Sequence, residues 1–304
     1  MVGVIHIYKT LASIIVSLIT VYYIFSAYDL NLLKILRQFR IVDYPLAIFS
    51  IVVFFVANYL NAVRLRGLLA KQGLFYSNWL IFKFGLVQSF FYSFFPGGVI
   101  SDLVRISLLI REIKQAYAIF KISILDRIYG FAGLIICFIG ILLSDGDVTK
   151  LALFSAPFVL GTVLFYPSGA VSTIRLAVYA ISISTVTMLV AGCSLYYGVL
   201  SVGIPQSFLT IFTLSLIATI SAAVPSINGI GVRDFLYILF FGAILSNETA
   251  VVISTIVLIL NMIMGLLGGV ILLFYKQFGV RLNSDLIREV QEEINKRRKP
   301  NDGD

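Results

Sequence analysis

The sequence predicts an all-α polytopic membrane protein with six full membrane spans and two re-entrant helical hairpins. Of the 304 residues, 60% are apolar and only 12% are charged, whereas a soluble domain has about 25% charged residues. Long runs without charge recur along the chain, and two of them are interrupted by proline and glycine. These observations exclude a water-soluble globule. They indicate one transmembrane domain over residues 1–275, followed by a charged tail over residues 276–304.

The composition also excludes several kinds of chemistry. His6 is the only histidine, and the two cysteines, Cys137 and Cys193, both lie in apolar runs. We therefore expect no metal site, no disulfide scaffold, no cofactor and no catalytic residues. The formal net charge of +8 is expected to orient the chain and to favour anionic lipid headgroups, not nucleic acid.

Six apolar runs are expected to be full membrane spans, and the first is long enough to cross a bilayer of about 30 Å at about 1.5 Å per helical residue. The first run is expected to remain as an anchor, because residues 25–28 make a poor signal-peptide cleavage site. The six predicted spans are residues 11–28, 45–63, 119–143, 151–166, 176–200 and 249–275.

Two further apolar regions are broken in the middle. Residues 78–95 lead through a Pro-Gly-Gly break into residues 99–110. Residues 207–224 lead through a break at 225–231 into residues 232–245. Such a break leaves backbone groups unpaired, which a membrane tolerates only where protein or a water-filled cavity supplies partners, so each region predicts a re-entrant hairpin. The predicted hairpin tips are Pro96, Gly97, Gly98, Pro225, Gly229 and Gly231.

The positions of lysine and arginine set the expected orientation. Cations are frequent after residue 275, which predicts a cytoplasmic tail and, by counting spans, two cytoplasmic termini. One loop does not fit, because residues 29–44 carry cations yet fall on the outer side. We expect residues 30–39 to form an amphipathic helix on the membrane surface. Its predicted lipid side consists of Leu32, Leu33, Ile35, Leu36 and Phe39.

The order of the elements predicts an inverted repeat. Two spans, a hairpin and one span occur in residues 11–143 and again in residues 151–275, and the two copies start on opposite sides of the membrane. Inverted repeats are typical of transporters, whose site lies near the midplane where broken helices meet. No strong residue-level repeat relates the two halves, so this prediction depends on the pattern of elements alone.

Asp126 and Arg127 lie roughly 10 Å inside a predicted span. Each would cost about 2.5–3.5 kcal/mol if it faced lipid. Neighbours in a helix project about 100° apart, so the two cannot be satisfied by each other and need partners from other segments. A structural ion pair and a functional polar site both fit this pattern. A stripe of small and polar residues, on which another helix or a lipid headgroup could lie, consists of Ser123, Asp126, Gly130, Gly133, Cys137 and Gly140.

The two breaks bring charged residues to the starts of new helices. Ser101 or Asp102 can cap the helix that follows the first break, and Arg105 lies about one turn further on, where it can contact a phosphate. In the alternative, Asp102 only caps and Arg105 only reaches the interface. At the second break, Arg233 is suited to hold an anion, and Asp234 either caps the helix or restrains the arginine.

Two other patterns have competing interpretations. Asn58, Asn61 and Arg64 share a face near the end of the second span, where Arg64 either contributes to a polar site or snorkels to the interface. Gly265 and Gly269 form a GxxxG pair, for which packing inside the protein is favoured over a dimer face.

Four of these segments together resemble a known family. The matching residues are Arg64-Leu65-Arg66-Gly67-Leu68-Leu69 with Gly73, the Pro-Gly-Gly break with Asp102 and Arg105, Asp126-Arg127 with Gly130, and residues 225–234 from Pro225-Ser226 to Arg233-Asp234. In order and spacing they resemble the flippase-type transmembrane domain of lysylphosphatidylglycerol synthase, the bacterial multiple-peptide-resistance factor, and its stand-alone relatives. The departures are Asn228, where the family more often has glycine, and Asp234, where it more often has glutamate.

The resemblance implies a multi-pass protein of the cytoplasmic membrane that moves phospholipids or polyprenyl-linked lipids between leaflets. The aminoacyl-transferring domain of the synthase is not expected, because only a short charged tail follows the last span, and synthesis of aminoacyl lipids is not predicted. The expected ligand is an anionic phospholipid or a polyprenyl-phosphate lipid. A glycosyltransferase or another lipid-modifying enzyme is a possible partner, and an oligomer remains open.

The sequence thus leads to a hypothesis of lipid transport. The residues expected to bind the lipid phosphate are Arg64, Arg105, Arg127 and Arg233, and those expected to support them are Asp102, Asp126, Asp234 and Asn61. One alternative is an accessory subunit that presents lipid to an enzyme. The other is a lipid-linked glycosyl or phosphoalcohol transferase, which would need paired acidic metal ligands.

Overall fold

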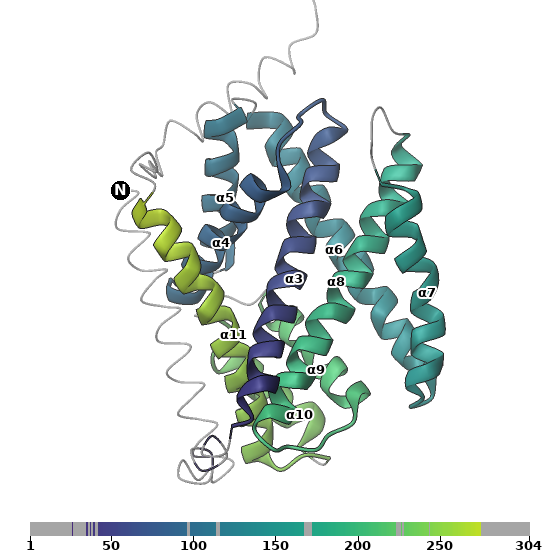
Figure 1. Cartoon of the computed structure of the whole chain (residues 1–304), viewed down its shortest axis with the longest axis vertical. Coiled ribbons are helices and arrows are strands. Elements are labelled where there is room, and N and C mark those ends of the chain that lie inside the picture. Colours follow the sequence, from purple (N-terminus) through teal and green to yellow (C-terminus); the bar gives the residue numbers. More distant parts are fainter. Residues whose placement is uncertain are drawn as a thin grey trace, which may run out of the picture.

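The computed structural model describes residues 42–95, 98–113, 116–166, 172–222, 226, 228–242 and 244–274, together with Ser26, Ile35, Arg37 and Phe39. Over the longer described ranges the chain forms helices joined by short turns, with no strand (Figure 1). The helices are α3 (Tyr44–Ala70), α4 (Asn78–Phe94), α5 (Gly98–Ile113), α6 (Ala116–Ser144), α7 (Val148–Leu164), α8 (Thr173–Ser201), α9 (Phe208–Ser221), α10 (Val232–Phe241) and α11 (Asn247–Phe274).

Four helices are long and apolar enough to cross a membrane, namely α3, α6, α8 and α11, with 27 to 29 residues each. They coincide with four of the six predicted spans, and an all-α chain with four such helices is consistent with a helical membrane protein. The predicted span at 151–166 is α7, which has only 17 residues. At about 1.5 Å per residue it is about 26 Å long, a little shorter than the bilayer core. The remaining predicted span, residues 11–28, lies outside the described residues except for Ser26, and the tail from residue 275 lies outside them entirely.

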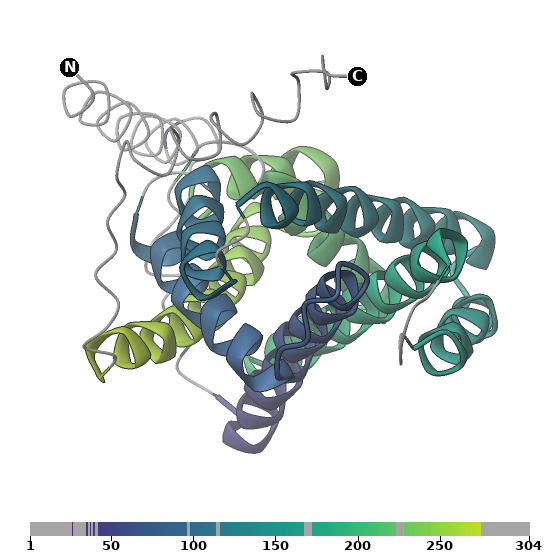
Figure 2. The ribbon, with the colours of Figure 1, turned by 90° about the horizontal axis from the view of Figure 1, so that it is seen from above.

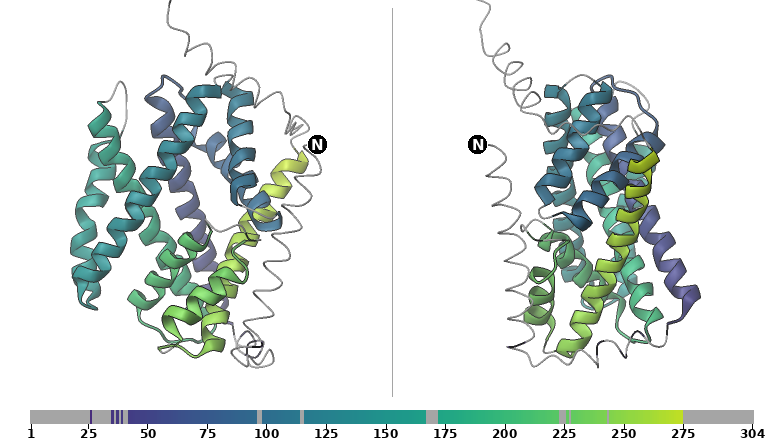
Figure 3. Two further views of the ribbon diagram at one scale, coloured as in Figure 1. Left: turned by 180° about the vertical axis from the view of Figure 1, so that it is seen from behind. Right: turned by 90° about the vertical axis from the view of Figure 1, so that its left-hand side faces the viewer.

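The broken regions form two helical pairs at opposite ends of the molecule. In Figure 1 the α4–α5 pair lies toward the upper end and the α9–α10 pair toward the lower end, and the views in Figure 3 agree. A hydrogen bond links α10 to α9, since the hydroxyl of Tyr237 donates to the carbonyl of Leu214 at 2.8 Å. Both α3 and α11 run from the lower end to the upper end. The end of α3 and the start of α11 therefore lie at opposite ends, as the predicted topology requires.

Helix starts follow local capping chemistry. Asp43 precedes α3 and its carboxylate accepts the backbone N–H of Leu46 at 3.2 Å. Asp147, in the turn before α7, accepts from the backbone of Thr149 at 2.8 Å, and this hydrogen bond lowers the pKa of the Asp147 carboxyl below its usual value. Serine residues cap three further helices with the same type of bond: Ser77 for α4, Ser172 for α8 and Ser207 for α9.

Small residues let the long helices approach closely. Where α3 crosses α8, Ser50 donates to the carbonyl of Ser194 at 2.7 Å and Ser194 donates back to the carbonyl of Ser50 at 2.8 Å. Gly265 and Gly269 on α11 face Ser93 and Phe90 of α4. The GxxxG pair is therefore used for packing inside the protein, the favoured of the two interpretations.

The small stripe on α6 is mostly a helix-packing surface. A Cβ atom at Gly133 would lie 3.0 Å from the backbone of Thr185 on α8, and one at Gly140 would meet Phe154 on α7. Helix α7 contacts α6 and α8 and lies at the edge of the bundle, as Figure 2 shows from above. Of the two uses foreseen for the stripe, contact with another helix accounts for this part of it.

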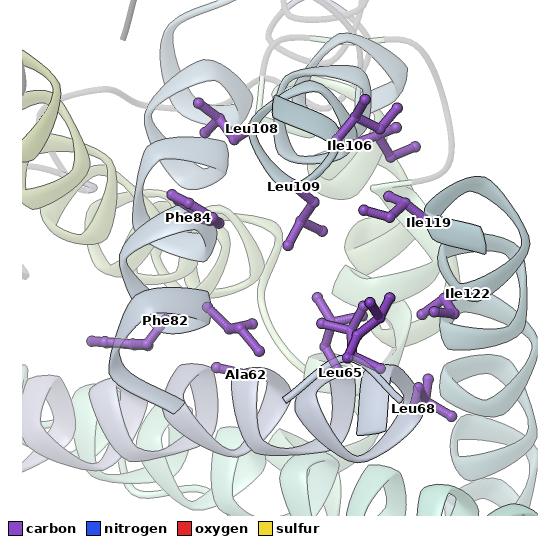
Figure 4. Close-up of a cluster of buried hydrophobic side chains, with 14 of the residues drawn as sticks. Ala62, Leu65, Leu68, Phe82, Phe84, Ile106, Leu108, Leu109, Ile119 and Ile122 are labelled. Atoms are coloured by element: carbon purple, nitrogen blue, oxygen red, sulfur yellow. The ribbon is translucent and has the colours of Figure 1, made fainter. Parts of the chain in front are cut away.

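The apolar core falls into two large clusters, one at each end. The first joins α3, α4, α5 and α6 and is drawn in Figure 4, where Leu65 faces a set of leucine and isoleucine side chains from α5 and α6. The second joins α8, α9, α10 and α11 and includes Ile35, which is only 5% exposed. The expectation that Ile35 faces lipid is therefore wrong, because protein side chains cover it. The rest of the predicted surface helix at 30–39 lies largely outside the described residues.

Candidate functional site

A cavity of about 770 Å³ lies between these elements, lined mainly by α3, α4, α5 and α6 with contributions from α8, α9 and α11. Its wall carries five charged side chains in an otherwise apolar helical bundle: Arg64, Asp102, Arg105, Asp126 and Arg127. Uncharged polar side chains also line it, beside apolar ones: Asn58, Asn61, Gln88, Ser89, Tyr92, Ser101, Thr219 and Asn261.

Asp126 is the centre of the charged cluster. It is 2% exposed and accepts from Nε of Arg64 at 2.8 Å and from Nη2 of Arg105 at 3.2 Å. Arg64 also donates through Nη1 to the hydroxyl of Ser184 on α8 at 2.8 Å. Gly130 lies one turn after Asp126, and a Cβ atom there would meet the guanidinium of Arg64 at 3.5 Å. That distance is an ordinary van der Waals contact, so the guanidinium of Arg64 packs against α6 at Gly130.

The expectation that Asp102 caps α5 is wrong, because α5 already begins at Gly98. Asp102 instead completes a reciprocal arrangement between α5 and α6. Arg127 of α6 forms an ion pair with Asp102 of α5, while Arg105 of α5 pairs with Asp126 of α6. Gln88 of α4 donates to the second oxygen of Asp102 at 2.8 Å. The prediction that Asp126 and Arg127 find partners on other segments is confirmed. The pairs connect α3, α4, α5 and α6 around the cavity, as expected for charges removed from water.

The balance of charge in the cavity is positive. Three arginines and two aspartates line it in the described part of the chain, which leaves one positive charge uncompensated there. Nε of Arg105 is buried and has no hydrogen-bond partner. Both carboxylates are held by guanidinium groups, so the chemistry fits an anion better than a metal ion. Among the described residues no group of three or more histidine, cysteine, aspartate or glutamate side chains comes together.

Arg233 lies next to the cavity rather than in its wall. The side chain is 2% exposed, donates from Nε to the hydroxyl of Ser254 at 2.8 Å and from Nη1 to the carbonyl of Asn228 at 3.2 Å. Asn261, which lines the cavity, donates to the side-chain oxygen of Asn228 at 3.1 Å. Arg233 is therefore linked to the cavity wall only through Asn228 and Asn261. Within the described residues it forms no ion pair.

The turn before α10 explains the position of Arg233. Asn228, Gly229 and Gly231 have φ angles of 51°, 75° and 81°, a left-handed conformation that asparagine and glycine adopt more readily than other residues. Asp234 accepts from the backbone N–H of Gly231 at 2.9 Å. Of the two roles foreseen for Asp234, the structure therefore shows helix capping, and the carboxylate does not hold Arg233.

Of the other residues expected at the site, some belong to the described part of the chain and others do not. Asn61 lines the cavity beside Asn58, on the face of α3 that also carries Arg64. Gly98 opens α5, whereas Pro96, Gly97 and Pro225 lie outside the described residues. Sequence reasoning missed the uncharged partners, of which the main ones are Gln88, Ser184, Ser254 and Asn261. Their only signal was a polar side chain inside an apolar run, which is common in membrane helices.

Comparisons with known proteins found no matching family model, no matching curated protein and no matching solved structure. The geometry of the cavity and of its charged residues is therefore the basis for assigning a function.

Proposed function

We propose that this chain is a flippase-like lipid transporter, which moves an anionic phospholipid or polyprenyl-linked lipid between the leaflets of a cell membrane. The single observation that carries the proposal is the cavity of about 770 Å³, whose lining brings Arg64, Arg105 and Arg127 together between largely apolar helices. Guanidinium groups are costly among aliphatic side chains, so three of them around one cavity favour a polar, negatively charged ligand.

The main barrier to flipping a lipid is removal of its charged headgroup from water. A phosphate in hydrocarbon is unfavourable, whereas one in a polar cavity exchanges water for guanidinium donors. The acyl chains need no such path and can stay in the bilayer. The cavity lining supports this separation of headgroup and acyl chains. Three of its residues are large, apolar and exposed: Ile128 at 55%, Phe131 at 62% and Ile220 at 42%.

The positions of the two helical pairs support an alternating opening of the cavity. The α4–α5 pair contributes Asp102 and Arg105 from one end, and α9 contributes Thr219 and Ile220 from the other. In the proposal both pairs are re-entrant hairpins of inverted halves, and the end of α3 at Lys71 lies on the cytoplasmic side. The resemblance to the flippase-type domain of lysylphosphatidylglycerol synthase points to the same activity and to the cytoplasmic membrane.

The state of the carboxylates favours transport over a transferase reaction. A lipid-linked transferase needs carboxylates free to bind a metal ion. Asp126 instead accepts from two arginines, while Asp102 forms an ion pair with Arg127 and accepts a hydrogen bond from Gln88. An accessory role beside an enzyme uses the same cavity, and it differs from transport in one respect, since an accessory protein alone would not move lipid.

Reconstitution in liposomes tests the proposal. Purified protein is inserted into vesicles containing a headgroup-labelled phospholipid, and a membrane-impermeant quencher reports the label that reaches the outer leaflet. We expect crossing to be faster than in empty vesicles, slower with Arg127→Ala, and unchanged with Lys150→Ala, which removes an exposed cation outside the cavity lining. Crossing no faster than in empty vesicles would contradict the proposal.

A further inference from the structure

The three arginines of the cavity differ in how fully their donors are used. Arg64 uses Nε for Asp126 and Nη1 for Ser184, both at 2.8 Å. The Arg127 side chain is 60% exposed and is paired with Asp102. Among the described residues, Arg105 makes one longer bond, 3.2 Å from Nη2 to Asp126, and its buried Nε has no hydrogen-bond partner. Arg105 is therefore the arginine in which a buried donor is left over.

The position of that donor on the guanidinium group is informative. Nε and Nη2 form one edge of the group, which is suited to hold two oxygen atoms of a phosphate side by side. In Arg105 only Nη2 is bonded on this edge, to an oxygen of Asp126. Buried polar groups are nearly always paired in native proteins, so a buried guanidinium donor left free beside a polar cavity is suited to bind a ligand. On this edge, Nη2 is thus bonded to the carboxylate of Asp126, and Nε is left for another acceptor.

We infer that Arg105 is the residue that contacts the transported anion, and that a phosphate-type group replaces Asp126 on its Nε–Nη2 edge. Asp126 is then an internal competitor of the ligand. Arg64 is a positioning residue, because its shorter bond keeps Asp126 in place when the carboxylate leaves Arg105. The inference deepens the proposed function and rests on it for the nature of the ligand.

The charge of the cavity indicates the charge of the ligand. In the described lining, three arginines face two aspartates, so one negative charge restores neutrality. A phosphodiester carries one negative charge. The recognised chemistry is therefore a singly charged phosphate group, which a lipid headgroup or a free phosphate ion can supply.

Binding measurements on the purified protein in detergent test the inference. Calorimetry is done with two probes, short-chain dihexanoyl phosphatidylglycerol below its micelle concentration and inorganic phosphate. We expect Arg105→Gln to weaken binding by about tenfold or more, the loss of one charge-assisted hydrogen-bond pair. Binding of the lipid but not of phosphate identifies the headgroup as the source, and Arg105-dependent binding of phosphate identifies the phosphate group itself. Affinity unaffected by Arg105→Gln would overturn the inference.

Asp126 gives the most specific prediction, because removing its charge is expected to strengthen binding of the anion. Asp126→Asn keeps an acceptor for Arg64 but removes the competing charge, so binding should become several-fold tighter. A purely structural role for Asp126 predicts weaker binding. Arg64→Gln should weaken binding, since Asp126 is then free to pair fully with Arg105, and adding Asp126→Asn should restore it. Adding Asp126→Asn to Arg105→Gln should not restore the affinity. A different pattern of affinities among these variants would contradict the assigned roles.

A second variant keeps the inference testable if Arg105→Gln does not fold. Arg105→Lys keeps the charge but has no Nε–Nη2 edge, so it should also weaken binding by about tenfold, and wild-type affinity would contradict the inference. Lys150→Gln serves as the control and should bind like wild type. Because no bilayer is present, Arg105-dependent binding without lipid crossing would contradict only the proposed function. Crossing with Arg105-independent binding would contradict only the present inference.

Discussion

Replacing Gly268 with alanine is expected to destabilise the contact between α11 and α4. Gly268 is buried, and a Cβ atom there would overlap the carbonyl group of Leu86 and lie 3.0 Å from the backbone nitrogen of Val87. Both groups belong to the backbone of α4. No side-chain rotation relieves the overlap, so the two helices must move apart along a contact that also includes Gly265 and Gly269.

The size of the effect follows from two opposing contributions. Overpacking by one methyl group costs about 1–3 kcal/mol, and alanine gains up to about 1 kcal/mol over glycine in a helix. Because the overlap is with rigid backbone, the cost lies at or above the upper end, and we expect a net loss of about 2 kcal/mol. At about 2–4 °C per kcal/mol, the melting temperature should fall by about 4–8 °C.

Thermal unfolding in detergent, followed with a thiol-reactive dye, measures this change because Cys137 is buried in the folded protein. Gly85→Ala is the matched control. Gly85 lies on α4 as well, but a Cβ atom there would have nothing within 4 Å, so its melting temperature should be unchanged or slightly higher. A Gly268→Ala protein that melts at or above the wild-type temperature would refute the packing argument.

Three further predictions concern the packing and the topology. Arg233→Gln should destabilise the protein by about 3 kcal/mol in the same assay, because it removes the charged donors to Ser254 and Asn228; an unchanged melting temperature would show that this link is unimportant. Ser50→Ala and Ser194→Ala should each cost only about 0.6–1.5 kcal/mol, and a larger loss would mean that their mutual bonds matter more than typical bonds between membrane helices. In a variant without native cysteines, Gln72→Cys and Ser246→Cys should react with impermeant thiol reagents from opposite sides of the membrane, and reaction from the same side would contradict the arrangement of α3 and α11.

Much of the fold could be predicted because long apolar runs and their boundaries are local features. The run at 119–143 became α6 (Ala116–Ser144), and the two breaks appeared where proline and glycine interrupt apolar segments. The sequence did not settle whether a short apolar helix crosses the whole membrane. Helix α7 has only 17 residues and contains Pro157, so its apolar character alone did not establish a full span.

The candidate site was only half predictable, for a physical reason. The cost of burying a charge shows from sequence that Asp126 needs partners, but not which ones. Its partner Arg64 is 62 residues away, and only the crossing of α3 and α6 brings the two together. The same holds for Asn261, which lies in an apolar run. Its bond to Asn228 depends on a left-handed turn that sequence suggested only as a flexible break.

The most direct test of the cavity as the lipid path is to block it reversibly and follow lipid crossing. Ser89 lines the cavity from α4, and Gln72 lies exposed after the end of α3. Each is changed to cysteine in a variant without native cysteines, and the protein is treated in liposomes with a bulky disulfide-forming reagent. Transport through the cavity predicts that modified Ser89→Cys stops moving lipid and recovers after reduction, while modified Gln72→Cys is unaffected. Undiminished crossing with a fully modified Ser89→Cys would contradict it.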